Sequence, residues 1–278
     1  MVPAVQRHLN RAATGNGEIP YELYIIDAYA KAMTAPRLLS LGCGSGGHEI
    51  RLAENGPFEQ VYGIDLAPGL IARARRTARE RGIENAVFES KDFLNEPVEG
   101  SFDMVLFHQS LHHFTDFRYI FEEFLPGVLR PDGLLVLHEY VGPDRLQWTD
   151  DQLTEANQAL RRIPPERRRI FRTPFFKSKI YRPGLWRMQA SDPSEAAASS
   201  QIIPALRKYT DTVEEKSLGG NILHLVLKDI AHHFCPDTDE LRGEIDTLIR
   251  AEQAFLKNEN SDFIFGVYRL KQGHSRRF

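Results

Sequence analysis

Short apolar runs alternate with amphipathic stretches between residues 37 and 141. Turn-forming residues separate the runs, as expected for buried strands, and the stretches between them repeat apolar residues at helical spacing. Strands that alternate with helices in this way form a parallel sheet with helices on both faces. The predicted strands cover residues 37–41, 61–64, 86–89, 103–107 and 134–139, and the predicted helices cover 47–55, 70–81 and 117–129.

The rest of the chain departs from this rhythm. Residues 1–16 contain no apolar run, and we expect residues 1–18 to form an arm, followed by a helix over 21–33. Residues 144–200 carry five prolines and little strand pattern, which predicts an irregular, partly helical insertion that covers a substrate as a cap. Beyond the insertion, the pattern predicts helices over 201–209, 221–234 and 237–258 and strands over 212–216 and 262–270.

These elements divide the chain into four segments. We expect an N-terminal arm and helix over 1–36, a ligand-binding α/β core over 37–143, the cap over 144–200, and a C-terminal part over 201–278 that completes the core sheet and its helices.

A glycine-rich turn follows the first predicted strand, in the segment LLSLGCGSGG that begins at Leu38. Glycine lets the backbone turn sharply and approach a bound nucleoside closely, because no Cβ intrudes and positive φ is accessible. The helix that follows offers free N–H groups. Alone, the turn is ambiguous, since Gly42, Gly44 and Gly47 also fit the dinucleotide pattern G-x-G-x-x-G.

Two carboxylates follow the next two predicted strands. Asp65 ends the second strand, 23 residues after Gly42, where an acid can accept both hydroxyls of a ribose. Asp92 follows the third strand, where it can accept from the amino group of an adenine while Phe93 packs on the ring. The second acid has no role in binding a nicotinamide dinucleotide, so it favours another adenosyl cofactor.

Taken together, residues 38–141 resemble the class I S-adenosylmethionine-dependent methyltransferases, in particular the small-molecule branch called type 11/12. The segment LRPDG, which begins at Leu129, is a mild variant of that family's L-x-P-G-G turn. The resemblance implies a Rossmann-like, mostly parallel sheet of seven strands and S-adenosyl-L-methionine as cofactor. It also implies the cofactor site: Gly42, Gly44 and Gly46 at the methionine part, Asp65 at the ribose, Asp92 and Phe93 at the adenine, His108 near the methionine end, and Leu66 as a further cofactor contact.

Methyl transfer is an in-line displacement, so a protein aligns the acceptor, excludes water and, for O–H or N–H acceptors, removes a proton. His112 and His113 follow the fourth strand and are candidate bases, although a structural role is an equal alternative. Glu139, at the end of the fifth strand, is a further candidate, whereas His138 points to the opposite face and is expected in the core. Nothing in this mixture requires a metal ion, and we expect none.

Two residues at the start of the cap are candidate substrate contacts. Arg145 could present a guanidinium and Trp148 a stacking face to a polar ring. The alternative for Trp148 is that it anchors the cap to the sheet.

Charge is unevenly spread. The net charge is −3, but residues 161–187 hold ten Lys and Arg against Glu166 alone, a local +9 that leaves −12 for the rest. The leading hypothesis is a methyltransferase that acts on a small polar acceptor, with O-methylation favoured over N- or C-methylation. The basic stretch suggests that the acceptor carries phosphate or carboxylate, for example a nucleotide sugar, glycan or acidic metabolite. An RNA or DNA methyltransferase is an alternative, although the N-P-P-Y or D-P-P-Y motif of base-amino methylases is missing after the fourth strand. A non-catalytic module that binds the cofactor is another.

Cys43 and Cys235 are the only cysteines and lack metal-ligand spacing, which favours a reducing compartment. No run of about 18 apolar residues occurs, so we predict a cytoplasmic protein with no membrane partner. The sequence does not indicate an oligomeric state.

Overall fold

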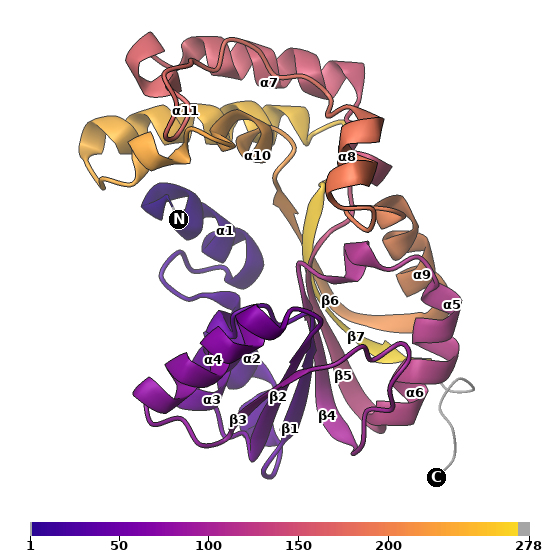
Figure 1. Ribbon diagram of the computed structural model, residues 1–278. Coiled ribbons are helices and arrows are strands. Elements are labelled where there is room, and N and C mark those ends of the chain that lie inside the picture. Colours follow the sequence, from indigo (N-terminus) through magenta and orange to yellow (C-terminus); the bar gives the residue numbers. More distant parts are fainter. Residues whose placement is uncertain (1, 272–278) are drawn as a thin grey trace.

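The computed structural model describes residues 2–271, which build a seven-stranded sheet in the order β3-β2-β1-β4-β5-β7-β6 (Figure 1). Every neighbouring pair is parallel except the two pairs that involve β7, which is antiparallel to both β5 and β6. The mostly parallel sheet is thereby confirmed. The strands are β1 (Arg37–Leu41), β2 (Gln60–Asp65), β3 (Ala86–Ser90), β4 (Phe102–His108), β5 (Leu129–Tyr140), β6 (Thr210–Gly219) and β7 (Phe263–Leu270).

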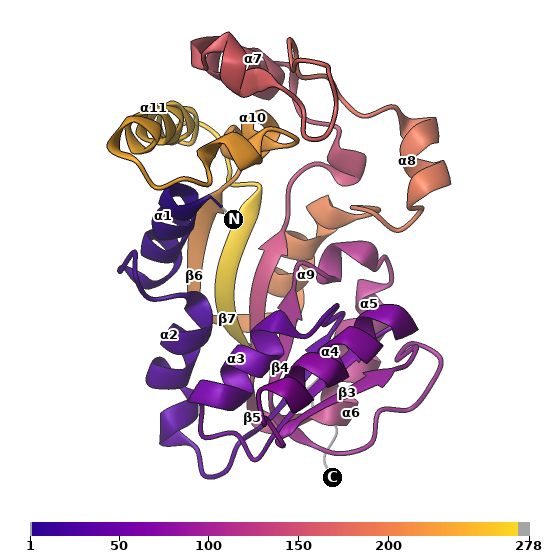
Figure 2. The same cartoon turned by 60° about the vertical axis from the view of Figure 1, so that its left-hand side comes forward.

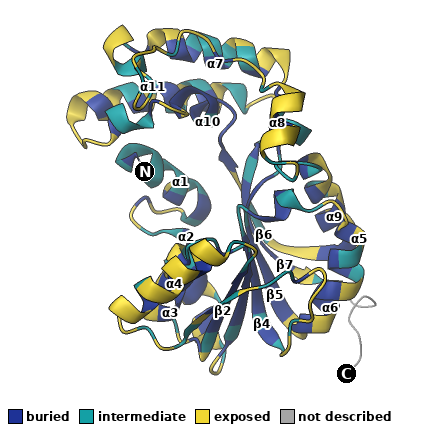
Figure 3. Cartoon of the chain, viewed as in Figure 1, coloured by how far each residue is buried: buried dark blue, intermediate teal, exposed yellow. Residues whose placement is uncertain are grey.

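The central strands are apolar at consecutive positions because helices cover both faces of the sheet. Successive side chains point to opposite faces, so Leu38 and Met104 join one core while Leu39 and Val105 join the other. The central strands β1 and β4 are accordingly buried, whereas the edge strands β3 and β6 carry exposed residues (Figure 3). One face carries α1 (Pro3–Thr14), α2 (Tyr21–Ala28), α3 (Gly47–Asn55) and α4 (Pro68–Glu80), and the other carries α5 (Phe117–Tyr119), a π-helical turn over Ile120–Phe124, α6 (Leu125–Val128) and α9 (Ile202–Tyr209).

Most of the segment that we expected to form an arm is the helix α1. Pro3 occupies the first helical turn, where its missing N–H is harmless, and Gly15 ends α1 with a φ of 81°. Good helix formers between these two residues complete the helix. The helix predicted over 21–33 is shorter than expected, because α2 ends at Ala28 and a 3-10 turn follows over Ala30–Ala32.

A helical layer lies above the carboxyl end of β5 (Figure 2). It contains α7 (Asp150–Arg162), which Thr149 caps through the N–H of Gln152, together with α10 (Leu223–Leu227) and α11 (Asp239–Phe255). These three helices share one apolar core, so α10 and α11 pack with the cap helix α7, whereas we expected residues 201–278 to complete the sheet and its helices. The reason is that four of the five residues of α10 are apolar and buried, so the helix needs cover on more than one side.

The remaining cap residues contain α8 (Leu185–Ser191) and two loops around it. Among residues 2–271, every helix is too short or too polar to cross a bilayer. Met1 and residues 272–278, which belong to the first and last predicted segments, lie outside the described residues.

Candidate active site

The glycine-rich turn joins β1 to α3 at the carboxyl edge of the sheet. Gly42, Gly44 and Gly46 all have positive φ, between 54° and 75°. The N–H of Gly42 donates to the carbonyl of Ile64 over 2.8 Å, which ties the turn to β2. The sequence therefore needs glycine here for its backbone conformation alone.

The space available for a Cβ shows which of the three glycines pack against the protein and which faces open space. A Cβ on Gly42 would lie 2.5 Å from the Cβ of Ser110, and one on Gly46 would lie 2.7 Å from the ring of Phe88. A Cβ on Gly44 would meet no atom within 4 Å. Gly44 therefore faces open space at the strand edge, as a residue beside a bound cofactor would.

Asp65 holds this edge together. Its Oδ2 accepts the N–H of Gly44 over 2.8 Å, and its Oδ1 accepts the N–H of Ala67 over 2.8 Å. One carboxylate thus positions the glycine turn and the loop after β2, and each oxygen retains a further lone pair for a ribose hydroxyl. The residues present fit an adenosyl group at this crevice.

The loop after β3 has a different arrangement from the one expected. Asp92 caps its own turn, since its carboxylate accepts the N–H of Leu94 and the side-chain amide of Asn95. Phe93 is 7% exposed and packs on Phe124 with ring centroids 4.7 Å apart, so its ring belongs to the core. Leu66 is 68% exposed and offers the free apolar surface at this edge.

His108 lies in a cluster of rings on the α2 face of the sheet. Its Nδ1 lies 2.9 Å from the hydroxyl of Tyr21, and its ring centroid is 3.6 Å from that of His48. Burial lowers the pKa of His108 well below its ordinary value, and the neighbouring His138 and His48 lower it further. Burial also lowers the pKa of His138 to about 4. Both imidazoles are therefore neutral at pH 7.

Glu139 and His112 form a buried pair on the opposite face. Glu139 is fully buried, and its Oε2 accepts the N–H groups of Ser110 and Leu111 over 2.9 and 2.6 Å. Its Oε1 lies 2.5 Å from Nδ1 of His112. From its place at the strand end, we expected Glu139 to face the substrate. Instead it is buried and orients His112.

The pair also makes His112 more basic. Burial opposes the charged imidazolium, but the hydrogen bond and charge of Glu139, with smaller contributions from Glu195 and Asp192, raise the pKa of His112 above its ordinary value. With Nδ1 bound to Glu139, the nitrogen Nε2 is left to face the cap.

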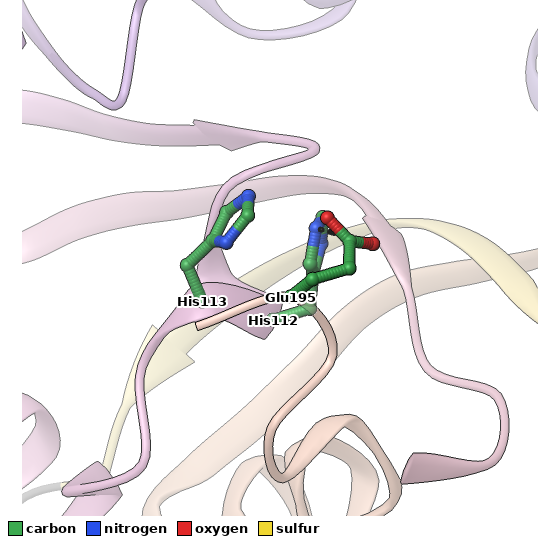
Figure 4. A group of neighbouring side chains, drawn as sticks. All are labelled: His112, His113 and Glu195. Atoms are coloured by element: carbon green, nitrogen blue, oxygen red, sulfur yellow. Dashed lines mark ion pairs between the residues drawn. The ribbon is translucent and has the colours of Figure 1, made fainter. Parts of the chain in front are cut away.

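His113 contacts the cap through a chain of hydrogen bonds. Its Nδ1 lies 2.9 Å from Oγ of Ser194, which donates to Oδ1 of Asp192 over 2.6 Å. That bond is the main cause that lowers the pKa of Asp192. Figure 4 shows the two imidazoles beside Glu195, whose Oε1 lies 3.9 Å from Nε2 of His112.

These three side chains could each offer one ligand atom, and the three atoms lie within 4.8 Å of one another. We expected no metal, and the expectation remains a prediction. Ser194 already occupies Nδ1 of His113, and Glu139 occupies Nδ1 of His112.

Arg145 and Trp148 both serve the cap itself. The guanidinium of Arg145 donates to the carbonyls of Pro193 and Glu195, so it holds the loop that reaches the two histidines. Trp148 is 4% exposed and packs in the apolar core of α7, α10 and α11. The buried ring anchors the cap and has no free face for stacking.

The sequence did not single out several residues of this region. Ser110 packs under Gly42 and donates to the carbonyl of Leu41 over 2.6 Å. Ser194 and Glu195 reach the histidines from the cap, more than 80 residues away in the chain. No local pattern marks any of the three, because each acts through a long-range contact.

Known methyltransferases match this chain over part of its length. A family model described as a methyltransferase domain matches residues 34–192. Demethylmenaquinone methyltransferase of Thermus thermophilus is 31% identical over 137 residues, which cover 49% of this chain and 61% of that protein. A 27-O-demethylrifamycin SV methyltransferase of Amycolatopsis mediterranei is 35% identical over 107 residues, 38% of this chain and 39% of that protein.

Solved structures extend the likeness of fold to most of the chain. The structure of the YcgJ protein of Bacillus subtilis aligns with 90% of this chain over 98% of the YcgJ chain, with a TM-score of 0.51 and 18% identity. A geranyl diphosphate methyltransferase in complex with SAM covers 90% of this chain and 84% of its own, with a TM-score of 0.53 and 14% identity. At such identities these structures support the fold alone. With the family model covering more than half of the sequence, the chain belongs to the class I S-adenosylmethionine-dependent methyltransferases.

Proposed function

We propose that the protein transfers a methyl group from S-adenosylmethionine to an oxygen of a small molecule, and that His112 removes the proton of that acceptor. The observation that carries the proposal is the Glu139–His112 pair, in which a buried carboxylate lies 2.5 Å from Nδ1 and leaves Nε2 toward the cap. A general base held in this way at the carboxyl edge of an α/β sheet suits a substrate whose hydroxyl group must lose its proton when it receives the methyl group.

The crevice beside Gly44 and Asp65 would hold the cofactor. Its sulfonium supplies an activated methyl group, so the protein needs no nucleophile of its own. The glycine turn supports close approach of the backbone, and Asp65 would bind the ribose hydroxyls. Leu66 would pack against the adenine, and Asp92, whose two oxygens each accept one bond within the turn and retain a further lone pair, would accept from the amino group of the adenine.

Neutral His108 and His138 fit this arrangement. A sulfonium carries a positive charge, which would be repelled by imidazolium groups nearby. Burial keeps both imidazoles uncharged at pH 7, so the ring cluster with Tyr21 can border the methionine end of the cofactor without that repulsion.

We infer an acceptor whose reacting end is neutral or cationic, in place of the anionic acceptor suggested by the basic stretch. Besides Glu139, the charged groups that act on His112 are Glu195, whose Oε1 lies 3.9 Å from Nε2, and Asp192, and all three are acidic. Several cations of the basic stretch are engaged within the fold: Arg167 pairs with Glu240 and Glu244, and Arg182 pairs with Asp150. An acceptor such as a phenol or an alcohol meets this electrostatic environment without repulsion.

A labelled-methyl transfer screen tests the proposal. The protein is incubated with S-adenosylmethionine and panels of phenols, alcohols, amines, carboxylic acids, sugar phosphates and RNA. The demethylated cofactor and the methylated acceptor are then identified by mass spectrometry. We expect S-adenosylhomocysteine to form together with an O-methylated phenol or alcohol. Transfer to RNA alone would contradict the proposal, and so would transfer restricted to carboxylates or phosphorylated sugars.

A further inference from the structure

The cap carries an unusual surface between residues 168 and 187. Of the eleven exposed large hydrophobic side chains in the described residues, six lie between 171 and 186. Trp186 is 87% exposed, Phe175 69% and Phe176 56%. The surfaces of soluble proteins rarely concentrate large apolar side chains in this way unless they bind a protein, a membrane or a ligand.

The same residues are strongly basic. Residues 168–187 contain seven Lys and Arg and no acidic residue. Among the cations, Arg172, Lys179 and Arg187 are exposed and form no ion pair within the described residues. The surface therefore combines large exposed aromatic rings with uncompensated positive charge.

Part of this surface is a rigid hairpin, residues 168–177, which we call the aromatic hairpin. Arg169 and Phe176 form an antiparallel bridge, and the N–H of Ile170 donates to the carbonyl of Phe175 over 2.9 Å. The ammonium of Lys177 donates to the carbonyls of Leu225, Val226 and Lys228. The hairpin is thus fixed to the end of α10, so the exposure of its rings is built into the fold and is not that of a loose loop.

We propose that the aromatic hairpin and the adjoining residues 178–187 dock on an anionic lipid bilayer. Phe, Tyr and Trp side chains partition into the interface between headgroups and acyl chains, and Lys and Arg bind the negatively charged headgroups. The charge of the surface is complementary to such a membrane. The proposal departs from our expectation of no membrane partner, which rested on the lack of a run long enough to span a bilayer. A contact at the bilayer surface needs no spanning helix, and none of the described helices is one.

Other occupants fit these observations less well. A second copy that used the same surface would bring two strongly basic segments together, which is unfavourable. Single-stranded nucleic acid binds aromatic rings that line a basic groove. Here the rings lie on an exposed hairpin, and neither the cavity between α1 and α11 nor the cavity between α9 and β6 is lined by any residue of 168–187.

The chain contains its own reporter for this contact. It has two tryptophans, of which Trp148 is 4% exposed and Trp186 is 87% exposed. Insertion into a bilayer should shift the emission of Trp186 to shorter wavelength, while Trp148 remains unchanged in its buried environment. A Trp186→Phe variant should bind vesicles without the shift.

Co-sedimentation with vesicles tests the proposal on the full chain. We expect binding to vesicles of phosphatidylcholine with phosphatidylglycerol, weak binding to phosphatidylcholine alone, and release at high salt. Phe175→Ser with Phe176→Ser should weaken binding at least about tenfold, and Arg172→Gln about fivefold. Val213→Ser, at another exposed apolar position on β6, is the matched control and should bind as the unmodified protein does.

Three results would overturn the proposal. One is the failure of the unmodified protein to bind anionic vesicles at low salt. A second is binding that the Phe175→Ser, Phe176→Ser variant retains in full. The third is a dimer in sedimentation, or retention on single-stranded RNA, that the same variant abolishes while vesicle binding stays absent. Because none of these measurements reads methyl transfer, they fail or succeed independently of the proposed activity.

Discussion

The two halves of the carboxyl edge of the sheet are built in different ways. On the cofactor side, the glycine turn and Asp65 follow consecutive strands, and the hydrogen bond between Gly44 and Asp65 joins residues only 21 positions apart in the sequence. On the acceptor side, His112 depends on Glu139 from the next strand and faces Glu195 from the cap. The cofactor side is thus built from segments close together in the sequence, which many related chains could share. The acceptor side is built from segments far apart, so substitutions there can change specificity for the methyl acceptor without loss of cofactor binding.

Glu139 offers the sharpest test of this division. Glu139→Gln preserves the side-chain shape but removes the charge that orients and raises the basicity of His112. We expect turnover to fall roughly 100-fold or more, with the affinity for S-adenosylmethionine unchanged. His112→Ala should have a similar effect, and His113→Ala a much smaller one.

The fold supplies a matched control for that variant. Glu252 is also fully buried, and its Oε2 accepts the N–H groups of Ile222 and Leu223, but no histidine of residues 2–271 forms a hydrogen bond with it. Glu252→Gln should therefore change the free energy of unfolding without a specific effect on turnover. Equal losses of turnover in both variants would mean that Glu139 acts only through stability.

The pH profile gives a readout that a purely structural role would not alter. A general base must be unprotonated, so kcat/KM should rise with pH through the pKa of His112, with a midpoint above the ordinary 6.5. Below that midpoint we expect a loss of about tenfold per pH unit. In Glu139→Gln the midpoint should move to lower pH, and a midpoint that does not move would assign the proton to another group.

Gly44→Ala tests the cofactor side. Its Cβ would point into open space where we place the cofactor, and the positive φ adds backbone strain. Gly15→Ala is the control, because Gly15 also has a positive φ and free space around it but lies at the end of α1. Both should lose about 1 kcal/mol of unfolding free energy. Calorimetry should show roughly tenfold weaker binding of S-adenosylmethionine only in Gly44→Ala.

Arg145→Ala should have the smallest effect, on the acceptor side. The variant loses the bonds to the carbonyls of Pro193 and Glu195 and loosens the loop that faces the histidines. We expect KM for the acceptor to rise roughly fivefold with little change in kcat. Arg145→Lys should restore part of the loss. A fall in kcat with unchanged KM would place Arg145 closer to the reacting atoms.

The sequence predicts most of the sheet because a strand buried on both faces leaves an unmistakable apolar run. It predicts Gly42, Gly44 and Asp65 because their chemistry needs fixed residue types at short spacing. It did not predict α1, whose helix depends on Pro3 and Gly15 at its ends and not on an apolar stripe.

The acceptor side was harder to predict for a physical reason. His112 and His113 are neighbours in sequence, and only their contacts distinguish them: a buried carboxylate for one and the hydroxyl of Ser194 for the other. Likewise, Trp148 could be a stacking surface or an anchor, and only its burial in the core of the cap decides. Local patterns do not encode contacts between segments that meet through the fold.

Calorimetric titration of S-adenosylmethionine into the unmodified protein and the Asp65→Ala variant tests the central assignment most directly. Two charge-assisted hydrogen bonds to the ribose should be lost with the carboxylate, so we predict binding by the unmodified protein and roughly 100-fold weaker binding by the variant. Thermal unfolding of the variant in the absence of ligand separates that loss from a loss of fold. An affinity for the compound that Asp65→Ala leaves unchanged would contradict a cofactor site at the ends of β1 and β2.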